Sequence, residues 1–136
     1  LAQLVGAIMA SGLLLISFGK VENLGATLPL NGNWLQSFVL ETVLTFILMF
    51  VIFGAALDKR AHSNLAGLAI GLTVGVEATC MGPITGASMN PARSFSPALM
   101  AGIWQHQWLY WVAPILGAQI AVIVYRILSN QFRDAK

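Results

Sequence analysis

The fold is decided by the stretch GPITGASMNPARSFSPALMAG, residues 82–102. It is too apolar for a loop surrounded by water, and Gly and Pro interrupt it too often for one membrane-spanning helix. Asn90-Pro91 is typical of a helix start, because Asn caps the first free amides and Pro suits the first helical position. The pattern predicts a helix from Ala92 to about Met100, which is about half a membrane thick.

The residues ahead of this short helix favour an extended chain with exposed carbonyl groups; they are Gly82, Pro83, Gly86, Ala87 and Ser88. Unpaired backbone at membrane depth is tolerated only inside protein or beside a water-filled cavity. We therefore expect a re-entrant segment over residues 82–102, with the backbone of Gly86 and Ser88 lining a hydrated path. The alternative is an extracellular loop that carries a short surface helix.

The composition excludes most classes of soluble protein. The 136 residues are 57% hydrophobic and only 9% charged, with a mean hydropathy of +0.78. Soluble domains carry roughly a quarter charged residues, so an ordinary cytosolic enzyme and a disordered segment are both excluded. The pI of 9.0 does not indicate a nucleic-acid partner, because the seven Lys and Arg are scattered. A single cysteine, Cys80, excludes a disulfide framework and a multi-thiolate metal site.

Four apolar stretches are long enough, or nearly so, to cross a bilayer, which takes about 20 apolar residues. They are residues 1–17, 38–57, 65–81 and 108–127. The sequence thus predicts an all-α membrane protein, a bundle of four spanning helices plus one re-entrant half-helix.

The basic residues orient these helices. Five of the seven lie in the loop 58–64 or near the tail: Lys59, Arg60, Arg126, Arg133 and Lys136. By the positive-inside rule, that loop and the C-terminus are expected to face the cytoplasm. The loop 20–37 and the segment 82–107 then face the outside, and the four spans alternate consistently.

Arg93 lies in the first turn of the expected half-helix. A charge within the hydrocarbon costs about 2.5–3.5 kcal/mol on insertion scales, so its guanidinium is expected to face a cavity or a partner. The positive end of the helix dipole adds to it. Together they raise a barrier against cations and protons that neutral solutes do not feel. Asn90 can offer its side-chain amide to water or to a hydroxyl group.

The motif GASMNPARS, residues 86–94, resembles the second signature loop of the aquaporin, or major intrinsic protein, family. The resemblance covers essentially the whole chain, because AQLVGA, Glu41-Thr42 with Thr45-Phe46, LAIGLTVG and HQWLYWVAP are similar to the family's third to sixth helices in order. It implies a passive channel for water, and for small neutral solutes in addition, without a cofactor. It also implies a homotetramer in the plasma membrane.

The family fold is an inverted repeat in which two half-helices meet at the membrane centre, whereas this chain holds one NPA motif. We therefore expect residues 1–136 to be the C-terminal portion of a single transmembrane domain. A natural truncated form is the alternative.

The resemblance also implies roles for single residues. The family's NPA Asn donates hydrogen bonds to solute at the pore centre, and the arginine after the motif belongs to a narrow outer filter. The motif is here Asn90, Pro91 and Ala92, and the filter positions are Arg93, Ala87 and Ala78.

These positions give conflicting indications about the solute. Classical water-only members tend to have a histidine at the position of Ala78, and many have a cysteine at that of Ala87, so a wider and less polar filter is expected here. Glycerol-type members usually carry an aspartate where this chain has Ser94, and the pair Tyr110-Trp111 resembles the water type. Water is the expected principal solute, and glycerol or metalloid hydroxides are the alternative.

Two carboxylates fall within the expected spans. A buried Glu41 demands partners, and the backbone amides before Asn90 are available. The matching glutamate braces this loop in the family, which implies the same role for Glu41. Glu77 is expected at a helix contact or an oligomer axis rather than in the pore, because adjacent helix residues point about 100° apart and Ala78 takes the filter position.

Two other classes of function compete with a channel. A secondary transporter also uses broken helices, but its coupled ionisable site at the midplane could only be Glu41 or Glu77. An intramembrane enzyme has no support, because the sequence holds no catalytic triad pattern, no HExxH motif and no paired carboxylates at the half-helix.

Overall fold

The computed structural model describes residues 1–58, 61 and 63–134, and over these residues the chain forms helices and loops without a strand. The α-helices are α1 (Ala2–Phe18), α2 (Trp34–Ile52), α3 (Ala66–Thr85), α4 (Pro91–Ala101) and α5 (Leu109–Asp134). Short turns of other helix types are η1 (Val21–Gly25), η2 (Leu30–Gly32), the π-helical η3 (Phe53–Leu57) and η4 (Ser63–Leu65). Lys59, Arg60 and Lys136, on which the expected orientation partly rests, lie outside the described residues.

Three of these helices are long and apolar enough to cross a membrane: α2 with its extension η3, α3 and α5. Helix α1 is also apolar but has 17 residues, which makes it about 26 Å long against a hydrocarbon thickness of about 30 Å. The four expected spans are therefore three helices of full length and one shorter apolar helix.

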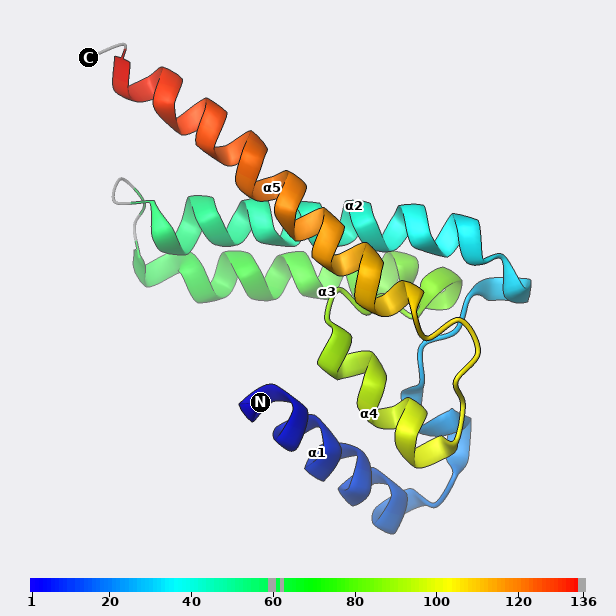
Figure 1. Ribbon diagram of the computed structural model, residues 1–136. Coiled ribbons are helices and arrows are strands. Elements are labelled where there is room, and N and C mark those ends of the chain that lie inside the picture. Colours follow the sequence, from blue (N-terminus) through cyan, green and yellow to red (C-terminus); the bar gives the residue numbers. More distant parts are fainter. Residues whose placement is uncertain (59–60, 62, 135–136) are drawn as a thin grey trace.

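The helices form two groups, which Figure 1 shows. Helices α2 and α3 lie side by side, and α5 crosses over α2. Helices α1 and α4 pack against each other below them. The groups are joined by the loop between α1 and α2, by residues 102–108 between α4 and α5, and by residues 86–90, which we call the arm. The arm thus passes from one group to the other.

Helices α2 and α5 approach each other closely at Gly117. A Cβ atom there would lie 3.0 Å from the backbone nitrogen of Phe46 and 3.0 Å from Cβ of Thr45, and would overlap the carbonyl oxygen of Thr42. Only a glycine lets the two backbones approach this closely. The crossing of α5 over α2 is therefore fixed by backbone contact.

Helix α3 continues four residues beyond the predicted end of its span, so the expectation that Gly82 and Pro83 belong to an extended chain was wrong. The helix ends at Thr85, and Gly86 follows in the left-handed conformation with φ +85°. Pro83 lies in the last turn, where its missing N–H removes a single helical hydrogen bond, and membrane helices tolerate such a loss. The arm is consequently only residues 86–90.

Helix α4 is the expected half-helix, and its predicted limits are confirmed to within one residue at each end. Asn90 caps it, because its Oδ1 accepts a hydrogen bond from the backbone nitrogen of Ala92 at 2.9 Å. Pro91 is the first helical residue, and Gly102 ends the helix with φ +77°. Its 11 residues measure about 16 Å, half the thickness of the hydrocarbon.

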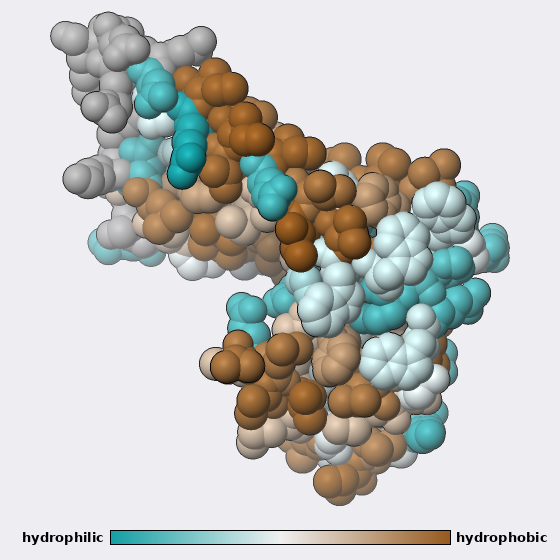
Figure 2. Space-filling model, viewed as in Figure 1, coloured by the Kyte–Doolittle hydropathy of each residue, from teal (hydrophilic) through white to brown (hydrophobic). Residues whose placement is uncertain are grey.

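Apolar and polar residues are distributed in the reverse of the soluble pattern. Large apolar side chains lie exposed on α1, α3 and α5, among them Leu13, Leu72 and Ile123, and Figure 2 shows apolar surface over α1 and α5. Many of the buried residues, in contrast, are polar: Ser11, Thr27, Ser37, Glu41, Thr45, Glu77, Thr85, Ser88, Ser94, Ser96 and Gln107. This distribution, with the spanning helices, is that of an integral membrane protein.

Candidate functional site

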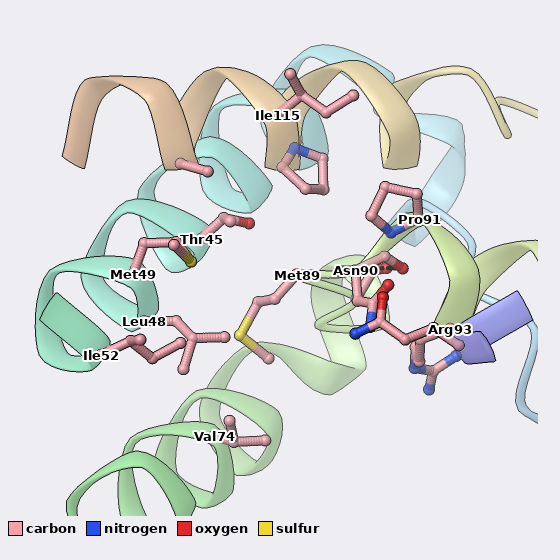
Figure 3. A pocket seen from close by; sticks show the side chains of 14 residues that line it. Thr45, Leu48, Met49, Ile52, Val74, Met89, Asn90, Pro91, Arg93 and Ile115 are labelled. Carbon is pink, nitrogen blue, oxygen red and sulfur yellow. Dashed lines mark hydrogen bonds between the residues drawn. The ribbon is translucent and has the colours of Figure 1, made fainter. Parts of the chain in front are cut away.

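The arm and the first turn of α4 border a cavity of about 510 Å³. Figure 3 shows Asn90, Pro91 and Arg93 on one side of it. The facing side chains come from all three long helices and include Thr45, Leu48, Met49, Ile52, Val74 and Ile115. Most of the facing wall is therefore apolar apart from Thr45, and further polar groups are supplied by Gln3 of α1, the arm and the half-helix.

Glu41 of α2 holds the arm. Its side chain is completely buried. Oε1 accepts hydrogen bonds from the backbone nitrogen of Ser88 and the hydroxyl of Thr85, both at 2.8 Å, and Oε2 accepts one from the backbone nitrogen of Met89 at 2.9 Å. A carboxylate so supplied with donors can remain in a low-dielectric site. This is the contact with the arm that the sequence predicts for Glu41.

Thr85 extends this network at the end of α3. Its Oγ1 accepts a hydrogen bond from the backbone nitrogen of Ala87 at 2.9 Å, and its carbonyl oxygen accepts one from the hydroxyl of Tyr110 at 2.6 Å. The arm is thereby tied to α2, α3 and α5 at once. No sequence motif pointed to Thr85 or to this contact of Tyr110.

The network fixes which way the peptide groups of the arm point. The N–H groups of Ala87, Ser88 and Met89 all point to Glu41 or Thr85. In a trans peptide the carbonyl points opposite to the N–H, so the carbonyl oxygens of Gly86, Ala87 and Ser88 point away from the carboxylate. Two non-glycine residues take positive φ values to allow this, 42° at Ala87 and 52° at Met89.

The loop between α1 and α2 rests on the arm through Thr27, which is 2% exposed. Thr27 donates a hydrogen bond to Oγ of Ser94 at 2.8 Å, and the hydroxyls of Ser94 and Ser88 also bond to each other. A Cβ atom at Gly86 would lie 2.8 Å from Cγ2 of Thr27. The arm therefore requires glycine at position 86 for its space as well as for its φ value.

Arg93 is held by the same loop, because its Nη1 donates a hydrogen bond to the carbonyl oxygen of Gly25 at 2.8 Å. The side chain is exposed along the wall of the cavity. Its charge therefore lies beside the positive end of α4, as its position in the first turn of that helix predicts.

Asn90 presents a hydrogen-bond donor to the cavity. Its Oδ1 is engaged in capping α4, so its remaining polar group is the Nδ2 amide, which can only donate. The residue is half-buried and lines the cavity together with Pro91. Water or a hydroxyl group that entered the cavity would find this donor close to the middle of the fold.

The structure brings some of the predicted site residues together and separates others. Asn90, Pro91, Arg93 and Ser88 line the cavity. Gly86 does not line it, and Ala92 is buried in the first turn of α4. Ala87 is buried against Leu44 and Met89, and Ala78 lies exposed on α3. Among the described residues no group of three His, Cys, Asp or Glu side chains could hold a metal ion.

The family model for the major intrinsic proteins matches residues 1–125. Nodulin-26 of Glycine max is 48% identical over 128 residues, which cover 93% of this chain and 47% of the relative. "Aquaporin NIP1-1" of Zea mays is 47% identical over 94% of this chain and 45% of its own length. "Probable aquaporin TIP3-2" of Oryza sativa subsp. japonica is 40% identical over 96% of this chain and 49% of its own length.

The chain spans about half the length of these curated relatives. The match nevertheless includes the arm, the half-helix and the long helices that hold them. The chain belongs to the major intrinsic protein family.

Proposed function

We propose that the protein carrying this chain is a passive transmembrane channel that conducts water and small neutral solutes and excludes ions and protons. One observation carries the proposal. The N–H groups of Ala87, Ser88 and Met89 are bound by Glu41 and Thr85, so the carbonyl groups of the same peptide units and the Asn90 amide remain for solute. The names of relatives such as "Aquaporin NIP1-1" support the same reading.

The proposed conduction path combines these groups in order along the arm. The carbonyl oxygens of Gly86 and Ser88 accept hydrogen bonds from water, and Asn90, with Pro91 and Ala92 behind it, donates one. Each water molecule that passes replaces hydrogen bonds to other water molecules by hydrogen bonds to the protein, so the free-energy cost of its dehydration is small. Glu41 is the brace that keeps the arm in this geometry.

The proposed filter consists of Arg93, Ala78 and Ala87. The guanidinium of Arg93 and the positive end of α4 repel cations and protons, while water and uncharged solutes pass. Arg93 is suited to this role because its contact with the carbonyl of Gly25 fixes the position of the charge.

A glycerol- or metalloid-permeable channel is the second candidate. Ala78 and Ala87 carry only methyl groups, and the wall that faces Asn90 is largely apolar, which suits the carbon backbone of a small polyol. A secondary transporter is less well supported, because Glu41 is completely buried and already accepts hydrogen bonds from three donors that hold the arm.

The setting of this channel is also part of the proposal. Residues 1–136 form the C-terminal portion of one transmembrane domain, which acts in the plasma membrane as a homotetramer with its C-terminus in the cytoplasm. The apolar side chains exposed on α1 and α3 are consistent with further protein or lipid contacts.

The test is stopped-flow osmotic shrinkage of proteoliposomes that contain the gene product carrying this chain, with an impermeant osmolyte and separately with glycerol. Fast water flow with slow glycerol entry supports the water channel, and fast glycerol entry supports the second candidate. The absence of both fluxes contradicts the proposal.

The barrier is tested with Arg93→Ala, with Arg126→Ala as a control that removes an exposed cation from α5. We expect Arg93→Ala to raise proton or cation leak at least about tenfold, which corresponds to about 1.4 kcal/mol of lost barrier, while water flow persists. Equal leak in both variants would contradict the role of Arg93.

A further inference from the structure

Glu77 is a second buried carboxylate, and its surroundings differ from those of Glu41. It lies near the middle of α3 and is 6% exposed. Among the described residues, neither Oε1 nor Oε2 has a hydrogen-bond partner. Glu41 has three donors at 2.8–2.9 Å. One carboxylate is thus satisfied, and the other is enclosed without a donor.

The position of Glu77 on α3 places it behind the arm. Glu77, Met81 and Thr85 are four residues apart, so they share one face of the helix. Met81 packs against the cluster that Leu44 of α2 forms with Ala87 and Met89 of the arm, and Thr85 donates a hydrogen bond to Glu41. The neighbouring residues Val76 and Ala78 point elsewhere and are exposed. The carboxyl group therefore faces the contact that α3 makes with α2 and the arm.

No positive charge faces this carboxyl group from the described elements packed against α3. Those elements are α2, η2, η3 and η4, and the only ionisable side chain on them is Glu41, which acts on Glu77 with the same sign of charge. The arm carries no ionisable side chain, and α3 itself carries only Cys80, which is exposed. Of the other ionisable residues nearby, Arg93 donates a hydrogen bond to the carbonyl oxygen of Gly25, and Tyr110 donates one to the carbonyl oxygen of Thr85.

An isolated carboxylate in such a place is expensive, and the ordinary outcome is that the group binds a proton and becomes neutral. Neutral Glu77 can remain in the contact between α3 and α2. The ionised group has to move to water, and the cavity is the nearest candidate, because Val74 lies one turn before Glu77 and lines it. Met89, against which Met81 packs, lines the same cavity.

We propose that Glu77 is a proton-binding site that couples flow through the channel to pH. With its proton bound, the side chain stays behind the arm and the path is open. When the proton is released, the carboxylate turns to the cavity, where it narrows the path and displaces the Met81 contact that supports Ala87 and Met89. This inference rests on the proposed channel function.

The first experiment measures osmotic water permeability in proteoliposomes of the gene product between about pH 5 and about pH 9.5, a range in which buried carboxyl groups titrate. We expect the permeability to fall severalfold toward alkaline pH. Glu77→Gln mimics the protonated group, so its permeability should stay at the acidic value throughout. The control Glu22→Gln removes a carboxylate from the exposed outer loop and should follow the unmodified protein. A flat profile of the unmodified protein, or an unchanged profile in Glu77→Gln, overturns the proposal.

The second experiment does not depend on flux. Infrared difference spectra of the unmodified protein should show a protonated carboxyl band that disappears on alkalinisation and that Glu22→Gln retains. Glu77→Gln should lack the band; if this variant does not assemble, Glu77→Asp should shift the pH at which the band disappears. A titrating band without water flow would leave the proton site standing and remove the channel. Water flow without a titrating band would support the channel and overturn the proton-binding site.

Discussion

Helix α2 is held against α5 and against the arm by different means. Against α5, the helix is held by shape, because the backbone at Gly117 meets the backbone at Thr42 and Phe46. Against the arm, it is held by hydrogen bonds, because Glu41 binds the backbone nitrogens of Ser88 and Met89. Helices satisfy their own backbone and need only fit one another, whereas the arm has no internal hydrogen-bond ladder and depends on side chains.

The largest effect is expected at the polar contact. Glu41→Ala should lower the free energy of unfolding by at least about 3 kcal/mol, because it leaves three buried donors without an acceptor and each costs about 1–3 kcal/mol. Thermal unfolding of the purified protein in detergent, followed by size-exclusion chromatography, measures it. Glu41→Gln keeps one acceptor oxygen and should lose less. Equal stability of Glu41→Ala and the unmodified protein would show that the arm does not depend on the carboxylate.

The packing contact is tested by the same substitution at two glycines. Gly117→Ala should cost about 1–3 kcal/mol, because overpacking a close contact displaces backbone. Gly71→Ala places a methyl group on the open side of α3, with nothing within 4 Å, and should stabilise the helix by up to about 1 kcal/mol. A melting temperature that falls in Gly117→Ala and rises in Gly71→Ala supports close backbone packing between α2 and α5. Changes in the same direction in both variants contradict it.

A third prediction concerns the contact between α1 and α4, which contains a hydrogen bond between helices. The hydroxyl of Ser96 donates to the carbonyl oxygen of Ala7 and lies 2.8 Å from Oγ of Ser11. Ser96→Ala should cost about 1 kcal/mol, the usual net value of such a bond. A double-mutant cycle with Ser11→Ala measures the coupling energy between the two hydroxyl groups. Strictly additive losses of stability would mean that α1 and α4 are held by packing, as α2 and α5 are, and not by this hydrogen bond.

The smallest effect is expected in the C-terminal half of α5. The ring of Tyr125 lies 5.5 Å from those of Phe50 and Phe53, and its hydroxyl donates to Oδ2 of Asp58 at 2.6 Å. Tyr125→Phe keeps the ring contacts and should cost about 0.5–1 kcal/mol at this half-buried position. Tyr110→Phe removes a fully buried hydroxyl and should cost more. The reverse order would mean that the hydrogen bond of Tyr125 contributes more to stability than that of Tyr110 at the arm.

The sequence was sufficient for the elements whose signals are local. Asn90-Pro91 and Gly102 mark the ends of α4 because capping depends on single residues and their neighbours. The long apolar stretches gave α2, α3 and α5 because spanning depends on composition and length. Pro83 led to the wrong end for α3, because a proline is tolerated in the last turn of a helix and the sequence does not show where that turn lies.

The contacts that join distant residues could be predicted only in part. A buried Glu41 needs donors, so its contact with the arm followed from charge, but the hydroxyl of Thr85 among those donors did not. The contact of Thr27 with Ser94 spans 67 residues and carries no pattern in the sequence. Ala78 lies on an exposed helix face and Ala87 in a buried cluster, and their assignment to one filter stays a prediction.

The brace at Glu41 also has a consequence for biogenesis. Its three donors follow it in the chain by 44 to 48 residues. At about 5–20 residues per second, the ribosome adds them about 2–10 seconds after the carboxylate. Until then α2 carries an unpaired acid, which costs about 2.5–3.5 kcal/mol at the centre of a membrane helix. Stable insertion of α2 into the bilayer is therefore expected only after α3 and the arm have been synthesised. Until then the nascent chain requires an environment that shields α2 from the lipid.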